Sequence, residues 1–287
     1  MSDTNTTQQS AQQALHYSLL SAFLKGTAKT PQMPENAIRI RSVLNDPHSS
    51  LEHLSRIINS DPPLAAYLMQ FADSPLLRTA RPCRTLRDVL ARLGTEKLNN
   101  LVLSFSVRNL FISKELPLQK TFRARWNASL VRAAWSACLS SAVPGLSADD
   151  ALLGGLFQDI GSLPLLAELE NWPQISRELD DLNATCEQLS GQIGTVLLTV
   201  WKQPSHLIDC ARYRNNSSQV SNEPSAQLYQ VVQIADAMQQ ADRQQALEKI
   251  PLAQHIFSDL TPANIEEQYK QQVNLWFILL GVKTRAL

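Results

Sequence analysis

The strongest constraint on the fold is a helical spacing of apolar residues that recurs along the chain. In the first stripe, apolar side chains lie three and four residues apart, which places them on one helix face. Its members are Leu15, Leu19, Leu20, Phe23 and Leu24. Only 9 of the 287 residues are Gly and runs of β-branched residues are scarce, so residues that disfavour helices are rare. The sequence therefore predicts an all-α protein, a compact multi-helix bundle.

Capping signals predict where several helices begin and end. In Asp61-Pro62-Pro63 the Asp can accept bonds from free amides, and Pro is tolerated in a first helical turn. Thr85 and Ser147 are further candidate N-caps, and Gly94 is a candidate helix end followed by a new start at Thr95.

Two candidate capping boxes predict additional helix starts. They are Ser49 with Glu52 and Thr185 with Gln188. Trp172-Pro173 predicts another start.

Breaks in the pattern divide the chain into four predicted parts. Pro117 marks the central break, at about residues 113–120, and a long helix is expected over about 121–142. The parts are a polar segment with a helix (1–30), a first helical part (31–115), a second helical part (116–240) and a helical extension (241–287). We expect the two middle parts to pack closely as two subregions of one bundle.

Charge and terminal features predict a soluble cytoplasmic protein. Lys and Arg together number 26, as do Asp and Glu, and this balance argues against nucleic acid as a partner. The first residues have neither the charge nor the apolar run of a signal peptide, and we expect no membrane-spanning segment. The four widely spaced cysteines fit buried, reduced thiols rather than a zinc or redox motif; they are Cys83, Cys138, Cys186 and Cys210.

The residues that catalysis would require are nearly absent. None of the five histidines stands beside an Asp, and no nucleophile or phosphate-loop motif occurs. We therefore predict no catalytic residue and no cofactor. One basic cluster could contact an acidic partner or an anion, although pairing with nearby acids is the alternative. It consists of Arg78, Arg81, Arg84 and Arg87.

Several short motifs follow one another over about residues 30–240. The clearest are Pro31-Gln32-Met33-Pro34, Asp61-Pro62-Pro63-Leu64, Phe71-Ala72-Asp73-Ser74 and Leu93-Gly94. The order of these motifs resembles the HDOD family. HDOD modules are helical output and adaptor modules of bacterial signalling proteins, related to the HD phosphohydrolases.

The resemblance implies a degenerate metal site. Catalytic HD proteins hold metal with a His, a His-Asp pair and a distant Asp. Here those positions fall on Ala128, Gln158 with Asp159, and Asp236. Further His positions of some relatives fall on Ser190, Arg214 and Asn215. Two carboxylates without imidazoles do not form the ligand set that activates water, so we expect no metal.

Two explanations remain for the retained carboxylates Asp159 and Asp236. In the first, each is buried and bridges helix ends by accepting backbone N–H bonds, while Gly155 and Gly161 allow close approach of neighbouring helices. In the second, the pocket binds a small anion or nucleotide without hydrolysing it.

The resemblance implies a non-catalytic regulatory module that binds another signalling protein in a bacterial cytoplasm. We expect a groove between the two helical halves, rimmed by the arginines of residues 78–87. The alternatives are a residual metal-dependent phosphohydrolase and a sensor that binds a nucleotide or cyclic dinucleotide near Asp159 and Arg214.

Overall fold

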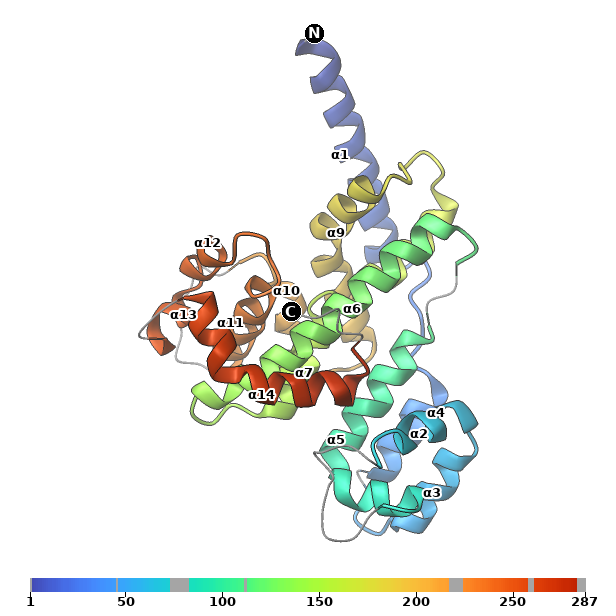
Figure 1. Cartoon of the computed structure of the whole chain (residues 1–287). Coiled ribbons are helices and arrows are strands. Elements are labelled where there is room, and N and C mark those ends of the chain that lie inside the picture. Colours follow the sequence, from blue (N-terminus) through green and yellow to red (C-terminus); the bar gives the residue numbers. More distant parts are fainter. Residues whose placement is uncertain are drawn as a thin grey trace.

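Helices make up all of the regular secondary structure in the part of the chain that the structure describes (Figure 1). This computed structural model describes residues 2–44, 46–72, 83–110, 113–216, 224–257 and 261–282. No strand occurs among those residues, which confirms the predicted all-α class.

The first helices form a small bundle at the bottom of Figure 1. Helices α2, α3 and α4 pack against one another and against the longer α5, whereas α1 extends away and packs against α9. Their bounds are α1 Ser2–Leu24, α2 Glu35–Leu44, α3 Leu51–Asn59, α4 Pro62–Met69 and α5 Leu86–Arg108.

The second half is built around α6 and α7, which pack against each other along their length. Helices α8, α9, α11 and α14 also contact α6, so α6 lies at the centre of this half. The bounds are α6 Leu116–Leu139, α7 Ala148–Phe157, α8 Ser162–Glu168, α9 Leu179–Val200, α10 Ser205–Arg212, α11 Pro224–Ala237, α12 Arg243–Glu248, α13 Pro251–Ile256 and α14 Pro262–Leu280. Short 3-10 turns follow α6 (η2, Ser140–Ala142) and α8 (η3, Leu169–Asn171).

Three predicted helix starts are confirmed by their side-chain caps. The Asp61 carboxylate accepts a bond from the Leu64 amide at 3.1 Å, and Ser147 accepts from the Asp150 amide at 3.3 Å. Thr85 forms a reciprocal capping box with Asp88. Gly94 has a φ of 75° inside α5 and divides it into two helical stretches, as the sequence predicts.

Other predicted boundaries are wrong. Helix α3 is capped by Ser50, not Ser49. Thr185 lies inside α9, where its hydroxyl donates to the Asp181 carbonyl at 2.8 Å, so it is not an N-cap. Ser and Thr can make this bond within a helix, and a capping-box pattern therefore also matches helix interiors.

Two more corrections concern α6 and α9. Helix α6 begins at Leu116 rather than near residue 121, because Pro117 is accommodated in its first turn. Trp172-Pro173 does not start a helix, since α9 begins only at Leu179.

The four-part division stays a prediction, and helices that it separates are in contact. Helix α5 packs against α7, and the Asn100 amide of α5 donates to the Asp149 carboxylate at 3.3 Å. The buried His16 of α1 hydrogen-bonds to Gln188 at 2.6 Å and to Thr185 at 3.2 Å, both on α9. Helix α1 is therefore fastened to the second half.

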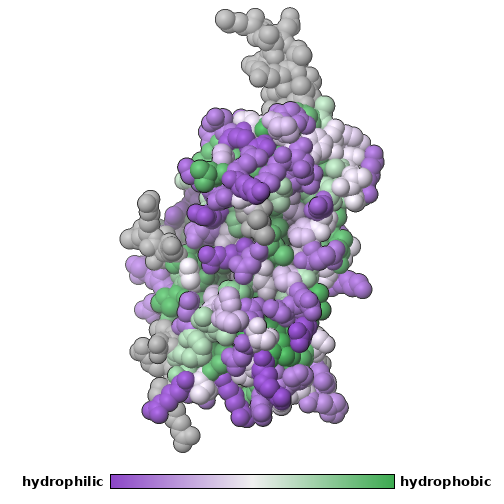
Figure 2. Space-filling view, turned by 90° about the vertical axis from the view of Figure 1, so that its right-hand side faces the viewer, coloured by the Kyte–Doolittle hydropathy of each residue, from purple (hydrophilic) through white to green (hydrophobic). Residues whose placement is uncertain are grey.

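One segment, Ala148–Asn171, is long and apolar enough to cross a membrane by length and composition alone. It comprises α7, α8 and the turns around them, and 89% of its most apolar window is buried inside the protein. Core helices of soluble proteins have the same properties. The face in Figure 2 is mainly hydrophilic, with hydrophobic residues in small separate areas.

Glycines allow the helices of the second half to approach closely, as predicted for Gly155 and Gly161. A Cβ on Gly155 would lie 2.6 Å from the Cα of Ala133 on α6. A Cβ on Gly161 would lie 2.0 Å from the Ser190 carbonyl oxygen on α9. Both obstacles are backbone atoms, which cannot rotate away.

We expect Gly155→Ala to destabilise the protein by about 1–3 kcal/mol or more, because it forces α7 away from α6. Gly154→Ala is the matched control. Its Cβ would meet the side-chain atom Cys210 Sγ at 2.9 Å, which can move, so the loss should be smaller. Urea unfolding of the two variants measures the difference. Equal losses would contradict the importance of the α6–α7 contact.

Candidate functional site

Asp159 lies in the turn after α7 and is buried, with a side chain 4% exposed. Arg125 of α6 donates to both carboxylate oxygens, from Nε to Oδ2 at 2.8 Å and from Nη2 to Oδ1 at 2.9 Å. Arg214, just after α10, donates from Nη1 to Oδ1 at 2.6 Å. The Ser190 hydroxyl of α9 donates to Oδ1 at 2.7 Å. One carboxylate thus joins α6, α7, α9 and the end of α10.

A second carboxylate, Glu187 of α9, bridges the same two arginines from the solvent side. Its two oxygens each accept a bond of 2.8 Å, one from Arg125 and one from Arg214. The Glu187 side chain is 57% exposed, whereas those of Arg125 and Arg214 are 10% and 7% exposed. Glu187 therefore covers two nearly buried guanidiniums.

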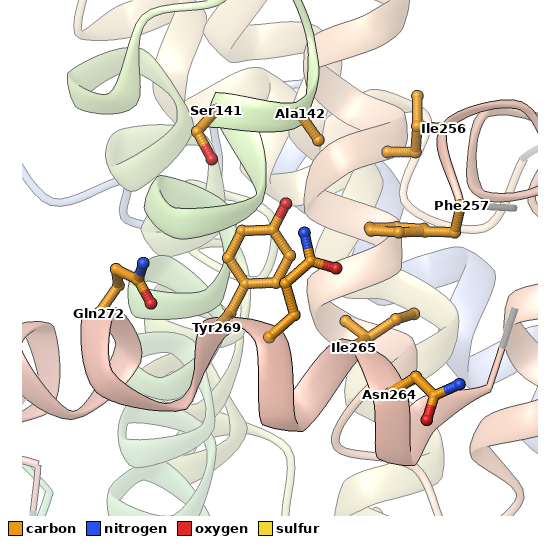
Figure 3. Close-up of a pocket in the computed structure, with 9 residues that line it drawn as sticks. Ser141, Ala142, Ile256, Phe257, Asn264, Ile265, Tyr269 and Gln272 are labelled. Atoms are coloured by element: carbon orange, nitrogen blue, oxygen red, sulfur yellow. The ribbon is translucent and has the colours of Figure 1, made fainter. Parts of the chain in front are cut away.

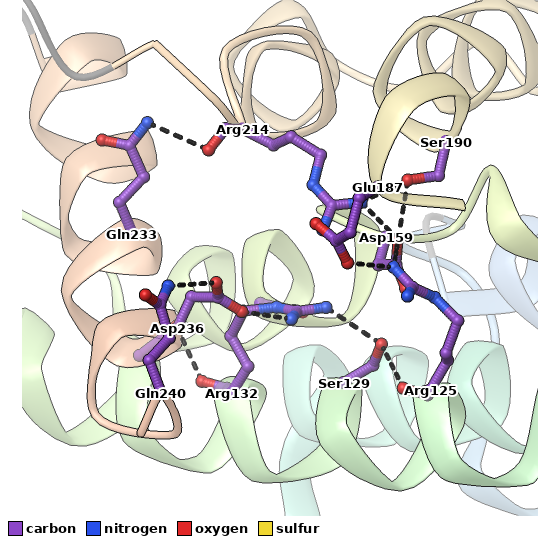
Figure 4. A network of polar contacts seen from close by, with 12 residues as sticks. Arg125, Ser129, Arg132, Asp159, Glu187, Ser190, Arg214, Gln233, Asp236 and Gln240 are labelled. Carbon is purple, nitrogen blue, oxygen red and sulfur yellow. Dashed lines mark hydrogen bonds and ion pairs between the residues drawn. The ribbon is translucent and has the colours of Figure 1, made fainter. Parts of the chain in front are cut away.

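Asp236 of α11 is bound by Arg132 of α6. Arg132 Nη1 donates to Asp236 Oδ1 at 2.6 Å, and its Nε donates to the Gly155 carbonyl at 3.0 Å. Its Nη2 donates to the Ser129 hydroxyl at 3.0 Å, and this hydroxyl donates to the Arg125 carbonyl at 3.1 Å. The contacts form one continuous network, shown in Figure 4.

The charges of this network balance, because three guanidiniums face three carboxylates. Burial alone would raise the pKa of Asp159, but the charges of Arg214 and Arg125 hold that pKa well below its usual range. Burial alone would lower the pKa of Arg125 and of Arg214, but Asp159 and Glu187 keep both pKa values above their ordinary range. All three groups therefore stay ionised throughout the physiological pH range.

The donor set does not fit a catalytic metal ion. The lone pairs of Asp159 are used by two arginines and a serine. On Asp236, Oδ1 accepts a bond from Arg132 at 2.6 Å and Oδ2 accepts one from Gln240 at 3.4 Å. Guanidinium does not lose its proton in proteins, so these cations cannot become metal ligands. Among the described residues, no group of three or more His, Cys, Asp or Glu side chains could hold a metal ion.

The remaining positions given by the family resemblance supply no strong ligand. Ala128 is partly exposed on α6, Asn215 is exposed, and Ser190 is engaged with Asp159. Gln158 is buried at the end of α7, and its Oε1 has no hydrogen-bond partner among the described residues. A neutral amide is a weak ligand for transition metals.

The structure corrects one explanation for the retained carboxylates. The side chain of Asp159 accepts bonds from two guanidiniums and a hydroxyl, and that of Asp236 from a guanidinium and the Gln240 amide, not from the backbone N–H groups expected. Asp159 is buried as expected, but the Asp236 side chain is 30% exposed. Arg125, Arg132 and Glu187 were missed by the sequence analysis. The sequence did contain an indication that the two arginines lie near the site. Arg125 and Arg132 stand three residues before and four residues after Ala128, so they share its helix face.

The predicted arginine cluster is only partly described. Arg78 and Arg81 lie outside the described residues. Arg84 and Arg87 are exposed at the start of α5, and within the described part of the chain neither forms an ion pair. Neither contacts the network around Asp159.

A separate cavity of about 590 Å³ lies between η2, the end of α13 and α14 (Figure 3). No charged side chain is among its described lining residues, so it offers no pair for acid–base catalysis. The lining residues are Ser141, Ala142, Ile256, Phe257, Asn264, Ile265, Gln268, Tyr269 and Gln272.

Comparison with known families gives the identity of the fold. The model of the HDOD domain family matches residues 30–217, well over half of the chain. The chain belongs to the HDOD domain family. This confirms the resemblance seen in the short motifs. No curated protein matches the chain significantly.

Solved structures show the same fold. A proposed metal-dependent phosphohydrolase of Shewanella amazonensis has a TM-score of 0.75 and 21% identity, covering 93% of this chain and 99% of that one. An HDOD domain protein of unknown function from Geobacter sulfurreducens has a TM-score of 0.62 and 18% identity, covering 93% and 97%. A proposed signal transduction protein of Marinobacter aquaeolei has a TM-score of 0.59 and 19% identity, covering 95% and 65%. At these identities the likeness shows the fold alone.

We expect Asp159→Asn to lower the free energy of unfolding by about 3–5 kcal/mol, because two nearly buried guanidiniums lose their charged partner. Urea unfolding measures the change. Glu267→Gln is the control, since it breaks an exposed ion pair with Lys270 and should cost at most about 1 kcal/mol. Similar losses for both variants would contradict the structural role of Asp159.

The difference between wild type and Asp159→Asn should also depend on pH. The pKa of Asp159 is lowered by folding, so its contribution is complete above the unfolded pKa of about 3.9 and decreases as the pH falls below it. Below that pH the unfolded chain binds a proton that the folded chain does not. A constant difference between about pH 6 and pH 3 would contradict this assignment.

Proposed function

We propose that this HDOD protein is a non-catalytic regulatory module that acts by binding another signalling protein in the cytoplasm. The observation that supports the absence of catalysis most strongly is the pairing of Asp159 with Arg125 and Arg214. In the proposal, Asp159 and Asp236 occupy the positions that the family resemblance assigns to metal ligands of HD phosphohydrolases, and arginine side chains bind both carboxylates.

Binding a catalytic metal at this place would require large changes. The metal would have to displace two guanidiniums from Asp159 and a third from Asp236, and these cations would remain close to it. Like charges in a site of low dielectric repel strongly. Without histidines to replace the lost ligands, the site has no means of activating water.

The chemistry of the surface supports a protein partner of acidic character. Arg84, just before the N-cap of α5, and Arg87, in its first turn, present two exposed cations in a chain with no net charge. Arg78 and Arg81 would add to this positive surface in the proposed contact. Arginine is common at energetically important positions of protein interfaces because its planar group binds carboxylates with two hydrogen bonds.

Metal content and hydrolysis test the absence of catalysis. Protein purified without chelator or metal-affinity resin should contain far less than one equivalent of Mn, Fe, Co, Ni or Zn per chain. It should not hydrolyse nucleotides or cyclic dinucleotides when these metals are added. Elemental analysis and product chromatography measure the two quantities.

About one equivalent of metal, lost in Asp236→Ala, would overturn the proposal. Hydrolysis of a nucleotide that Asp236→Ala abolishes would overturn the proposal as well. Either outcome would favour the phosphohydrolase alternative.

Charge reversal tests the proposed partner surface. Arg84→Glu with Arg87→Glu should release signalling proteins that co-purify with the wild type, because it replaces two exposed cations by anions. Lys120→Glu with Lys249→Glu is the matched control, since these lysines are also exposed but lie in the second half and the C-terminal extension. Quantitative mass spectrometry of the bound proteins measures the loss. Retention of every partner by the first variant would contradict the role of this surface.

A further inference from the structure

A cleft of about 650 Å³ lies where the two helical halves meet. Its walls come from α4 and α5 on one side, from α6 on the other and from the end of α14. This volume lies in the range of about 300–1,000 Å³ that is usual for small-molecule sites. The cleft is distinct from the Asp159 network, because none of its lining residues belongs to that network.

Both walls of the cleft carry stacked aromatic rings. Tyr67 of α4 stacks on Phe105 of α5, with ring centroids 5.1 Å apart and planes inclined by 30°. Phe122 stacks on Trp126 of α6, with centroids 6.2 Å apart and planes inclined by 19°. Phe105 and Trp126 remain partly exposed, so each wall can offer an aromatic surface to a planar ligand.

The cleft is also positively charged. Arg108, at the end of α5, and Arg123, in α6, both line the cleft, and no Asp or Glu is among its described lining residues. Both arginines are exposed, and neither forms an ion pair within the described ranges. In the Asp159 network, by contrast, every guanidinium faces a carboxylate. The two cations of the cleft are therefore available for an anion that comes from outside the described chain.

We propose that this cleft binds a nucleoside monophosphate without hydrolysing it. The base would stack on the rings of Phe105 and Trp126, and the phosphate would accept charge-assisted hydrogen bonds from Arg108 and Arg123. A free phosphate would leave the aromatic surfaces uncovered, and a nucleoside would leave the guanidiniums unpaired. A ligand with both groups satisfies both features of the cleft.

Such a ligand would contact α5 and α6 together and so link the two halves of the bundle. Binding would favour one arrangement of the halves over others, in proportion to its difference in affinity for them. The proposed regulatory module would then respond to nucleotide concentration at a place separate from the family's metal positions.

Isothermal titration calorimetry of the full chain with AMP and with GMP tests the proposal. At least one of the two should bind, whereas inorganic phosphate and the parent nucleoside should bind at least about tenfold more weakly, since each lacks one kind of contact. Arg123→Gln and Trp126→Leu should each weaken binding by about tenfold or more. Chromatography should recover the nucleotide intact.

Two controls separate this cleft from other sites. Lys202→Gln with Lys249→Gln removes two exposed cations elsewhere and should leave the affinity unchanged. Glu187→Gln alters the Asp159 network and should leave it unchanged as well. Circular dichroism checks that Trp126→Leu is folded. If this variant is unfolded, Arg123→Gln still tests the site, because Arg123 is exposed.

The proposal is overturned if neither nucleotide binds at millimolar concentration. It is also overturned if Arg123→Gln binds as tightly as the wild type, or if only Glu187→Gln changes the affinity. The last result would place the ligand at the Asp159 network. Metal content does not enter this test, and a failure to bind nucleotide leaves the proposed non-catalytic function standing. Hydrolysis of the bound nucleotide would instead contradict that function.

Discussion

The buried Asp159 carboxylate holds the second half of the protein together. It receives bonds from Arg125 on α6, Ser190 on α9 and Arg214 after α10, while it lies itself at the end of α7. A carboxylate with one partner missing would be costly in such a place, because burial disfavours its charge. Two guanidiniums and a hydroxyl offset that cost, and their geometry fixes four helical segments relative to one another. The close packing at Gly155 and Gly161 brings α7 against α6 and the turn after α7 against α9, so it joins segments that the carboxylate also joins.

Arg132 extends this arrangement to α11 and couples polar contacts to helix packing. It binds Asp236, and it also donates to the carbonyl of Gly155, the residue whose missing side chain lets α7 approach α6. Together, three arginine side chains balance the three carboxylates Asp159, Asp236 and Glu187. The second half of this HDOD fold is thus held together by ion pairs between side chains as well as by apolar packing.

The limits of sequence analysis follow from the range of each interaction. Caps such as Asp61, Thr85 and Ser147 act within three residues, so the sequence predicts them correctly. The prediction of a helix start at Thr185 was wrong because the same local pattern also occurs in helix interiors. The partners of the carboxylates lie far away in the chain: 34 residues separate Arg125 from Asp159, and 104 separate Arg132 from Asp236. Such pairs become evident only once the helices are placed, although the spacing of Arg125 and Arg132 around Ala128 was an available indication.

The arginines of this network have a consequence for how its charges come to be balanced. Arg125, Arg132 and Arg214 belong to the polypeptide, and a guanidinium stays protonated in proteins. The cations that face Asp159, Asp236 and Glu187 are therefore synthesised together with these carboxylates and in a fixed ratio. The network needs no cation from outside the chain to balance its charge.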